Sequence, residues 1–164
     1  MAVMAKKRSS AAPTAAVRVL IEAGIPHELQ RFDAGHDHFG QHAADALEAP
    51  AELILKTLVI DHGSGLAVCC IPVTGRLSLK KAAAALGVSK ATMADPAKAS
   101  RSSGYIPGGI SPIGQRTSLP TLIDTSVHDA PAVYVSGGRR GLDITLSPTD
   151  LATVTGAHFI DLVQ

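Results

Sequence analysis

The chain has 164 residues, of which 46% are hydrophobic and 18% charged, and its formal net charge is +1. This length supports one domain with a sizeable core, and this composition excludes disorder for the bulk of the chain. The near-neutral charge argues against a dedicated DNA-binding domain, and no apolar run reaches the roughly 18 residues that a membrane span needs.

The first part of the chain is expected to contain a tail, a helix and a polar loop. Residues 1–12 hold a basic cluster without the apolar segment of a secretory signal, so we expect a flexible basic tail before a domain at 13–164. Residues 14–24 carry apolar side chains at helical spacing, and Gly24 is placed to end that helix. A polar loop and a short helix near 41–47 should follow.

The middle of the chain predicts a hairpin and a helix. Two apolar strands are expected at 53–60 and 66–72, and the turn residues at 62–65 indicate an antiparallel pair. The next helix should begin after Ser78 as its N-cap and end at Gly87.

A segment rich in glycine and proline separates the two halves of the domain. Asp95 and Pro96 have the residue types that open a helix. Residues 104–120 then hold too many glycines and prolines for regular structure, yet their apolar residues predict that the segment is packed.

The last third predicts strands and a final helix. Strands are expected near 121–125, 132–136 and 142–146, with a loop at 136–141. The final helix should start after Ser147 and end at Gly156. Helices mixed with hairpin strands favour a single α+β domain with a mixed sheet.

The two cysteines, Cys69 and Cys70, are neighbours in an apolar strand. Adjacent strand residues point to opposite faces, so a disulfide between them is not expected. We interpret them as buried packing residues of a reduced, cytoplasmic protein.

Lys56 is the most informative residue for function. It lies in a strand whose two faces are otherwise apolar, where an unpaired ammonium has a high desolvation cost. Either Lys56 reaches solvent near the strand end, or it meets a carboxylate or an anionic ligand. The sequence leaves these two interpretations open.

The segment Gly108-Gly109-Ile110-Ser111-Pro112 is a second candidate. Paired glycines allow close backbone approach and aim N–H groups at an oxyanion, and Ser111 offers a hydroxyl. An ordinary tight turn is the alternative, because the segment matches no phosphate-binding fingerprint.

Asp143 is a third candidate. Alternation with its apolar neighbours places it on the opposite face of its strand, where it could orient a lysine or bind a ribose hydroxyl. The alternative is a solvent-facing aspartate or a partner of Arg139 or Arg140. Those two arginines could contact nucleic-acid phosphates or be solvated.

His36, Asp37, His38 and His42 crowd one polar loop. A zinc site needs three or four ligands at suitable spacing, and Gly40 weakens the helix that would align two of them. We therefore expect no metal site, and a metal hydrolase stays a weak alternative.

Five segments occur together in a fixed order: Lys56-Thr57-Leu58, LSLKKAAAALG (77–87), MADP (93–96), SSGYIPGGISPIGQ (102–115) and YVSGGRRGLDI (134–144). Together they resemble the YbaK/EbsC family of bacterial Cys-tRNA(Pro) deacylases, over residues 14–163. The resemblance implies a mixed, partly barrel-like sheet flanked by helices, as in the editing domain of prolyl-tRNA synthetase.

The resemblance also implies an activity. Members hydrolyse the ester between cysteine and tRNA(Pro) in trans, without metal or cofactor, in a transient complex with prolyl-tRNA synthetase and the misacylated tRNA. The cysteine's own thiol attacks its ester carbonyl. No membrane and no DNA are expected among the partners.

The resemblance assigns roles to residues by matching positions. Lys56 would hold the 3′-terminal nucleotide, with Thr57 beside it. The 108–112 loop would cradle the aminoacyl-adenosine end, with N–H donors from Gly109 and the hydroxyl of Ser111 in catalysis. Asp143 would fix Lys56 or a ribose hydroxyl, and Gly141 would help to bind substrate.

One segment departs from the family pattern. Residues 31–40 make a loop about two residues shorter than is usual in the family, with Phe32 in place of a tyrosine. Editing of alanyl- or seryl-tRNA by a positioned water therefore stays open, since those substrates lack a thiol. A module that binds aminoacyl-tRNA or nucleotides without catalysis is the third alternative.

Overall fold

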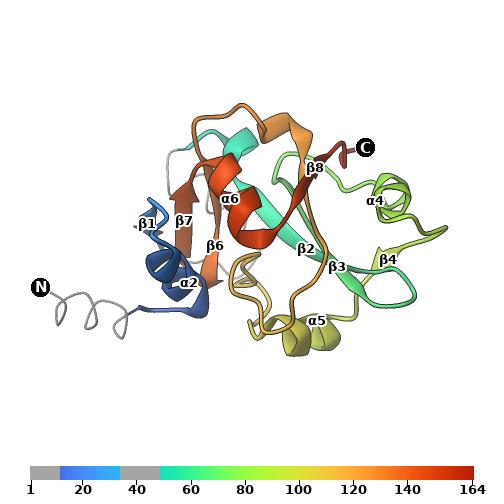
Figure 1. The fold of residues 1–164 in the computed structure, drawn as a ribbon, viewed down its shortest axis with the longest axis horizontal. Helices are drawn as coiled ribbons and strands as arrows, with labels where there is room; N and C mark the ends of the chain where they lie inside the picture. The colour runs from blue at the N-terminus through green and yellow to red at the C-terminus, as the bar shows by residue number, and fades with distance from the viewer. Residues whose placement is uncertain (1–11, 34–48) are drawn as a thin grey trace, which may run out of the picture.

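The computed structural model describes residues 12–33 and 49–164, and its elements form one α+β unit (Figure 1). Its helices are α2 (Ala15–Ala23), α4 (Leu79–Leu86), α5 (Pro96–Ser103) and α6 (Pro148–Thr155), with short 3-10 helices η1 (Ala51–Leu53) and η2 (Thr125–Val127). Within these ranges, no helix has the length and apolar character required to cross a bilayer.

The strands form two sheets. An antiparallel sheet has the order β1 (Glu28–Arg31), β7 (Leu142–Leu146) and β6 (Val133–Arg139). A mixed sheet has the order β4 (Thr92–Met93), β2 (Leu55–Asp61), β3 (Leu66–Pro72), β5 (Thr121–Asp124) and β8 (His158–Ile160). A parallel bridge between Ile54 and Tyr134 joins the two sheets. The expected mixed sheet is present as part of this arrangement, and it does not close into a barrel.

The helix ends confirm the predicted capping residues. Each N-cap side chain accepts a hydrogen bond from a backbone N–H three residues later, which satisfies a donor that the helix leaves unpaired. Ser78, Asp95 and Ser147 were predicted as caps, and Thr14, which was expected inside the first helix, is a fourth cap. The predicted end residues Gly24, Gly87 and Gly156 have the left-handed conformation that glycine adopts without a steric cost.

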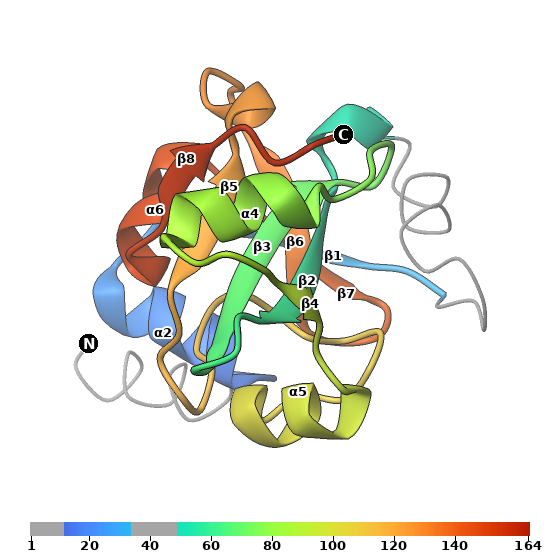
Figure 2. The same ribbon diagram turned by 90° about the vertical axis from the view of Figure 1, so that its right-hand side faces the viewer.

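Two apolar clusters cover opposite faces of the mixed sheet. The larger lies between the two sheets and includes α2 through Val17 and Leu20 and α6 through Leu151. The smaller lies under α4, which crosses the other face of the mixed sheet (Figure 2). β2 and β3 are thus buried from both sides, as their continuous apolar runs predict.

Several predicted boundaries were wrong. β2 starts at Leu55, because η1 occupies the residues before it. The loop expected at 136–141 is mostly strand, since β6 continues through a bulge to Arg139. The short strands β1, β4 and β8 carry too few residues for a period-two pattern and were not expected. The basic tail up to residue 11, the helix near 41–47 and the His36–His42 cluster lie outside the described residues.

Candidate active site

Polar residues from four strands share one face of the molecule. In an antiparallel pair, directly opposed residues lie on the same face, and Asp143 of β7 is opposite both Gln30 of β1 and Ser136 of β6. Ser136 and Lys56 each lie two residues beyond the Tyr134–Ile54 bridge that joins β6 to β2. The polar row Gln30, Asp143, Ser136 and Lys56 therefore crosses the junction of the two sheets.

Asp143 is buried, with 7% of its surface exposed. Burial raises the pKa of its carboxyl to about 7, because low polarity disfavours the charged form. Within the described residues, no hydrogen bond or ion pair compensates this burial. The solvent-facing and Arg-paired interpretations of Asp143 were both wrong. A buried carboxyl that lowers stability is typical of a functional position.

Lys56 is half-buried at the end of β2 that faces β6. It forms none of the ion pairs that connect residues in the described ranges. A direct Lys56–Asp143 pair, one of the two roles expected for the aspartate, is thus not present. Lys56 is left able to bind an anionic group from outside the chain.

Glycines allow close packing at the turn end of the β6–β7 hairpin, which follows Ser136 of the polar row. A Cβ placed on Gly137 would lie 2.8 Å from Cγ of Leu142, and one on Gly138 would lie 2.8 Å from the Tyr105 ring. Gly141 has a φ of 81°, and its carbonyl accepts a hydrogen bond from the N–H of Phe32 at 3.0 Å. This bond brings Phe32 and Gly141 together, next to the strands that carry Gln30 and Asp143.

The loop at 106–113 packs against the same hairpin. A Cβ on Gly109 would lie only 2.7 Å from Cα of Arg139, so glycine is required for this close approach. The Arg140 side chain ties the loop down through a 2.9 Å hydrogen bond from Nε to the carbonyl of Pro107. Two segments that are distant in sequence therefore meet at one edge of the row.

The N–H donors of this loop differ from those expected. The Gly109 N–H donates to the carbonyl of Ile106 at 3.0 Å, so it is not free for an oxyanion. The N–H groups of Gly108 and Ile110 have no acceptor within the described residues. Gly108 is exposed and Ile110 is partly exposed, so their amides are candidates for contact with a substrate oxygen.

Three predicted site residues lie away from the polar row. Ser111 is fully buried, and its Oγ accepts a hydrogen bond from the N–H of Ile113 at 3.2 Å. Alternation places Thr57 on the opposite face of β2 from Lys56, directly across from Cys70. Pro112 lies on the side of its loop that faces away from the polar row.

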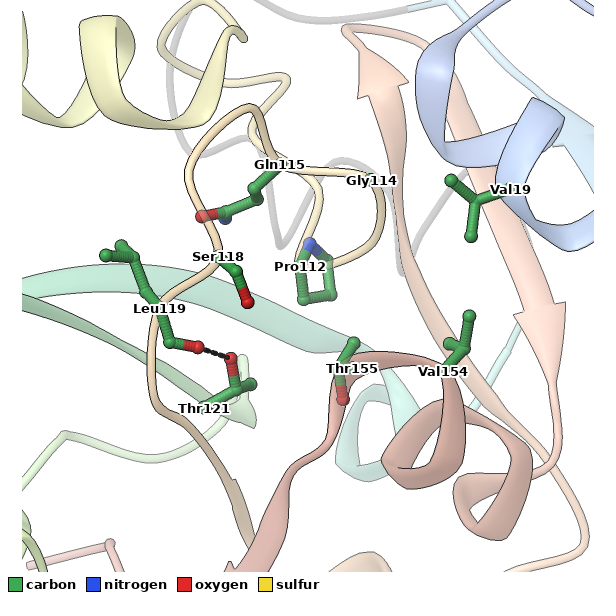
Figure 3. Close-up of a pocket in the computed structure, with 9 residues that line it drawn as sticks. All are labelled: Val19, Pro112, Gly114, Gln115, Ser118, Leu119, Thr121, Val154 and Thr155. Atoms are coloured by element: carbon green, nitrogen blue, oxygen red, sulfur yellow. Dashed lines mark hydrogen bonds between the residues drawn. The ribbon is translucent and has the colours of Figure 1, made fainter.

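That far side lines a cavity of about 220 Å³ between the loop, α2 and α6. Figure 3 shows Pro112 and Ser118 from the loop facing Val154 and Thr155 of α6. Neither Lys56 nor Asp143 lines this cavity. The cavity and the polar row are therefore separate features of the molecule.

Both cysteines are buried, as expected. Burial raises the pKa of Cys69 and of Cys70 to about 12, so both thiols stay protonated at neutral pH. A protonated thiol is a poor nucleophile, and neither cysteine can serve as one. In the part of the chain that the structure describes, no group of three metal-ligating side chains occurs.

Ser136 and Gln30 are candidate site residues that were not predicted from the sequence. Ser136 falls at the boundary expected between strand and loop, where alternation with Val133 and Val135 could have placed it beside Asp143. Gln30 belongs to β1, whose four residues gave no signal. Its position follows only from pairing with β7.

Comparisons with known proteins identify the family of this chain. Residues 39–154 match the family model described as the aminoacyl-tRNA editing domain. A protein of Enterococcus faecalis, EbsC, named as a candidate Cys-tRNA(Pro)/Cys-tRNA(Cys) deacylase, is 33% identical over 97% of this chain and 98% of its own length. The chain belongs to the aminoacyl-tRNA editing family.

Solved structures support the same fold for this editing domain. A crystal structure described as a candidate trans-editing enzyme for prolyl tRNA synthetase is 26% identical, with a TM-score of 0.79 over 98% of this chain and 96% of that one. A second, of hypothetical protein APE2540, has a TM-score of 0.84 at 22% identity, covers 92% of this chain and all of that one, and shows the fold alone.

Family membership confirms the expected enzyme class, an aminoacyl-tRNA deacylase, with an aminoacylated tRNA as substrate. The resemblance to the YbaK/EbsC family is confirmed as well.

Proposed function

We propose that this editing domain deacylates Cys-tRNA(Pro) and that the substrate's own thiol attacks the ester. The single observation that carries the proposal is the polar row with Lys56 and Asp143 beside a loop that holds two free amides. The row offers an ammonium and a carboxyl, and the loop offers N–H donors, but neither holds an activated nucleophile among the described residues. The names of the relatives support the substrate.

Such an enzyme is needed because proline and cysteine have similar volumes. A binding pocket rejects a near-isostere by only about 1–3 kcal/mol, so errors must be removed at a second site. Proline has no thiol, and a mechanism that requires one spares the correctly charged tRNA.

The chemistry is an intramolecular acyl transfer. The cysteine sulfur forms a bond to its own carbonyl carbon, and the bond from that carbon to the ribose oxygen breaks. The thiol proton is transferred to the ribose oxygen, so the products are a cysteine thiolactone and a free tRNA 3′ end. Holding the cysteinyl side chain of the substrate in the reactive conformation supplies much of the rate acceleration.

Each part of the site has a role in this reaction. The Lys56 ammonium binds the phosphate of the 3′-terminal nucleotide, and the Gly108 and Ile110 amides stabilise the developing oxyanion. Asp143 accepts a hydrogen bond from a ribose hydroxyl. Phe32 and Gly141 contact the aminoacyl end of the substrate. Ser111 and Pro112 hold the loop in shape, and Thr57 supports Lys56 from the other face of β2.

Separate reactions with Cys-, Ser- and Ala-tRNA(Pro) test the proposal, together with Cys-tRNA(Pro) methylated at sulfur. We expect rapid loss of the cysteinyl ester and none of the S-methyl ester, because a thioether cannot attack the carbonyl. Loss of the S-methyl, seryl or alanyl esters would show attack by water instead. Stable esters that are protected by stoichiometric protein would indicate a binding module.

We also propose that prolyl-tRNA synthetase provides the choice of tRNA. The net charge of +1 gives little overall attraction for a polyanion, so the protein alone should not select among tRNAs. Adding the synthetase should raise the deacylation rate for Cys-tRNA(Pro) above that for Cys-tRNA(Cys). Equal rates with and without the synthetase would argue against this partner.

A further inference from the structure

We infer that three exposed arginines, Arg101, Arg116 and Arg139, form a surface that binds phosphates of the tRNA acceptor end. This inference rests on the proposed function and extends it from the reacting ester to the rest of the substrate. The three residues are far apart in sequence, and three sets of contacts bring them together. These three side chains make up the basic surface.

Backbone hydrogen bonds place Arg116 at the end of α5. The Arg116 N–H donates to the carbonyl of Ser103 at 2.9 Å, and the next N–H, of Thr117, donates to Ser102 at 3.0 Å. The Arg116 side chain then lies over Gly104, since a Cβ there would be 3.6 Å from Nε. Arg101 lies in the last turn of the same helix.

The loop that follows α5 connects this pair to Arg139. Gly109 approaches Cα of Arg139 closely, and the Arg140 side chain binds the carbonyl of Pro107. Arg140 is thus used to hold the loop, and it is not part of the basic surface. Figures 1 and 2 both show α5 near the turn between β6 and β7.

The basic surface has no partner of opposite charge within the described residues. The ion pairs there join Lys81 to Asp161, Lys98 to Asp61 and His128 to Asp129. All three arginines are exposed. Two of them also lie at a helix C-terminus, where a cation stabilises the helix, but that role does not apply to Arg139.

The position of the basic surface identifies its ligand. Arg139 follows Ser136 on β6, so the basic surface begins beside the polar row that would hold the ester. Ile106, in the loop that connects α5 to the contact with Arg139, is 57% exposed and offers an apolar contact for unpaired bases. A ligand that spans both sites has an aminoacyl ester at one end and several phosphates beyond it, which describes the acceptor end of a tRNA.

A comparison of two substrates tests the inference. The variant Arg101→Gln/Arg116→Gln/Arg139→Gln is assayed with Cys-tRNA(Pro) and with the 3′-cysteinyl ester of adenosine 5′-monophosphate, called the adenosine ester below. This small ester keeps the phosphate that Lys56 would bind and lacks the phosphates of the other nucleotides. We expect kcat/KM for the tRNA to fall about 10-fold or more at low salt, with a dependence on log salt that is shallower by about 2–3. The rate with the adenosine ester should not change.

A matched variant controls for loss of general charge. Arg76→Gln/Lys80→Gln/Lys90→Gln removes three exposed cations around α4 and should leave the tRNA reaction unchanged. Arg→Lys at the three positions of the basic surface should restore the salt dependence, since lysine also binds phosphate. Thermal unfolding of each variant verifies that the fold is intact.

The outcomes separate the two proposals. Wild-type protein that cleaves neither ester would refute the proposed function. Wild-type activity with an unaffected triple arginine variant, an equal loss in the control variant, or a loss on the adenosine ester as well would overturn the basic surface. A loss confined to the tRNA substrate supports it.

Discussion

The two hairpins of this protein, β2–β3 and β6–β7, differ in regularity. β2 and β3 pair from Leu55–Pro72 to Asp61–Leu66 without interruption. β6 and β7 pair regularly as far as Ser136–Asp143 and then shift register before Arg139. The first hairpin is buried on both faces, whereas the second leaves one face to polar residues.

This difference in regularity coincides with the position of the proposed site. A bulge bends its strand and frees backbone groups, so it redirects side chains that a regular ladder would hold in line. Here the interrupted hairpin carries Asp143 and contacts both Phe32 and the loop at 106–113. The regular hairpin contributes one polar residue to the row, Lys56.

The largest effect on activity is expected for Lys56, the one residue that the regular hairpin contributes to the polar row. Lys56→Ala should lower kcat/KM for Cys-tRNA(Pro) about 100-fold or more, because the ammonium that binds the 3′-terminal phosphate and so positions the ester is lost. The free energy of unfolding should change little, since Lys56 makes no ion pair with a described residue. Steady-state kinetics and urea unfolding measure the two quantities. Lys90→Ala is the exposed control, and near-normal turnover by Lys56→Ala would refute the role of this lysine.

A pair of glycine variants compares the hairpins directly. Gly137→Ala should cost about 1–3 kcal/mol of stability and reduce activity, because its Cβ would overlap Leu142. Gly65→Ala, in the turn of the regular hairpin, should be nearly neutral, since its Cβ would have an ordinary 3.4 Å contact with the His62 ring. Urea unfolding of both variants measures the two losses in free energy of unfolding. Equal losses would contradict the expected difference between the hairpins.

Asp143→Asn should change the pH dependence of stability. The folded-state pKa of about 7 exceeds the ordinary value of 3.8, so the folded protein binds this proton more tightly than the unfolded chain does. Wild-type stability is therefore lost as the pH rises from 3.8 toward 7. The asparagine variant should be about 1–3 kcal/mol more stable than wild type at pH 8, with no difference near pH 4.

The same variant should lose deacylase activity while it gains stability. Unfolding curves at several pH values, with activity measured in parallel, test this exchange. A variant that is less stable than wild type at pH 8 would show that the Asp143 carboxylate has a stabilising partner.

The smallest effect is expected in the regular hairpin. Cys70→Ala should leave kcat unchanged and lower the free energy of unfolding by about 1 kcal/mol, because a small buried group is removed. Native protein should also resist alkylation at both cysteines, and denatured protein should react. Loss of activity in Cys70→Ala would mean that a protein thiol takes part after all.

The helices were the most predictable elements. Thr14, Ser78, Asp95 and Ser147 cap their helices with bonds that span three residues, so short stretches of sequence contain the whole signal. The β2–β3 hairpin was predictable for the same reason, since its strands and turn are contiguous. The strands β1, β4 and β8 were not, because long-range pairing stabilises them and local propensity does not.

The amino-acid sequence alone determined the fold class, the family and the identity of Lys56, Asp143 and the glycine loop as candidates. Residue type and local spacing express those features. Only the tertiary structure decided that Asp143 is buried, that Thr57, Ser111 and Pro112 point away from the row, and that Ser136 and Gln30 belong to it. Strand register and the bulge in β6 decide these placements, and both depend on contacts between residues that are far apart in the chain.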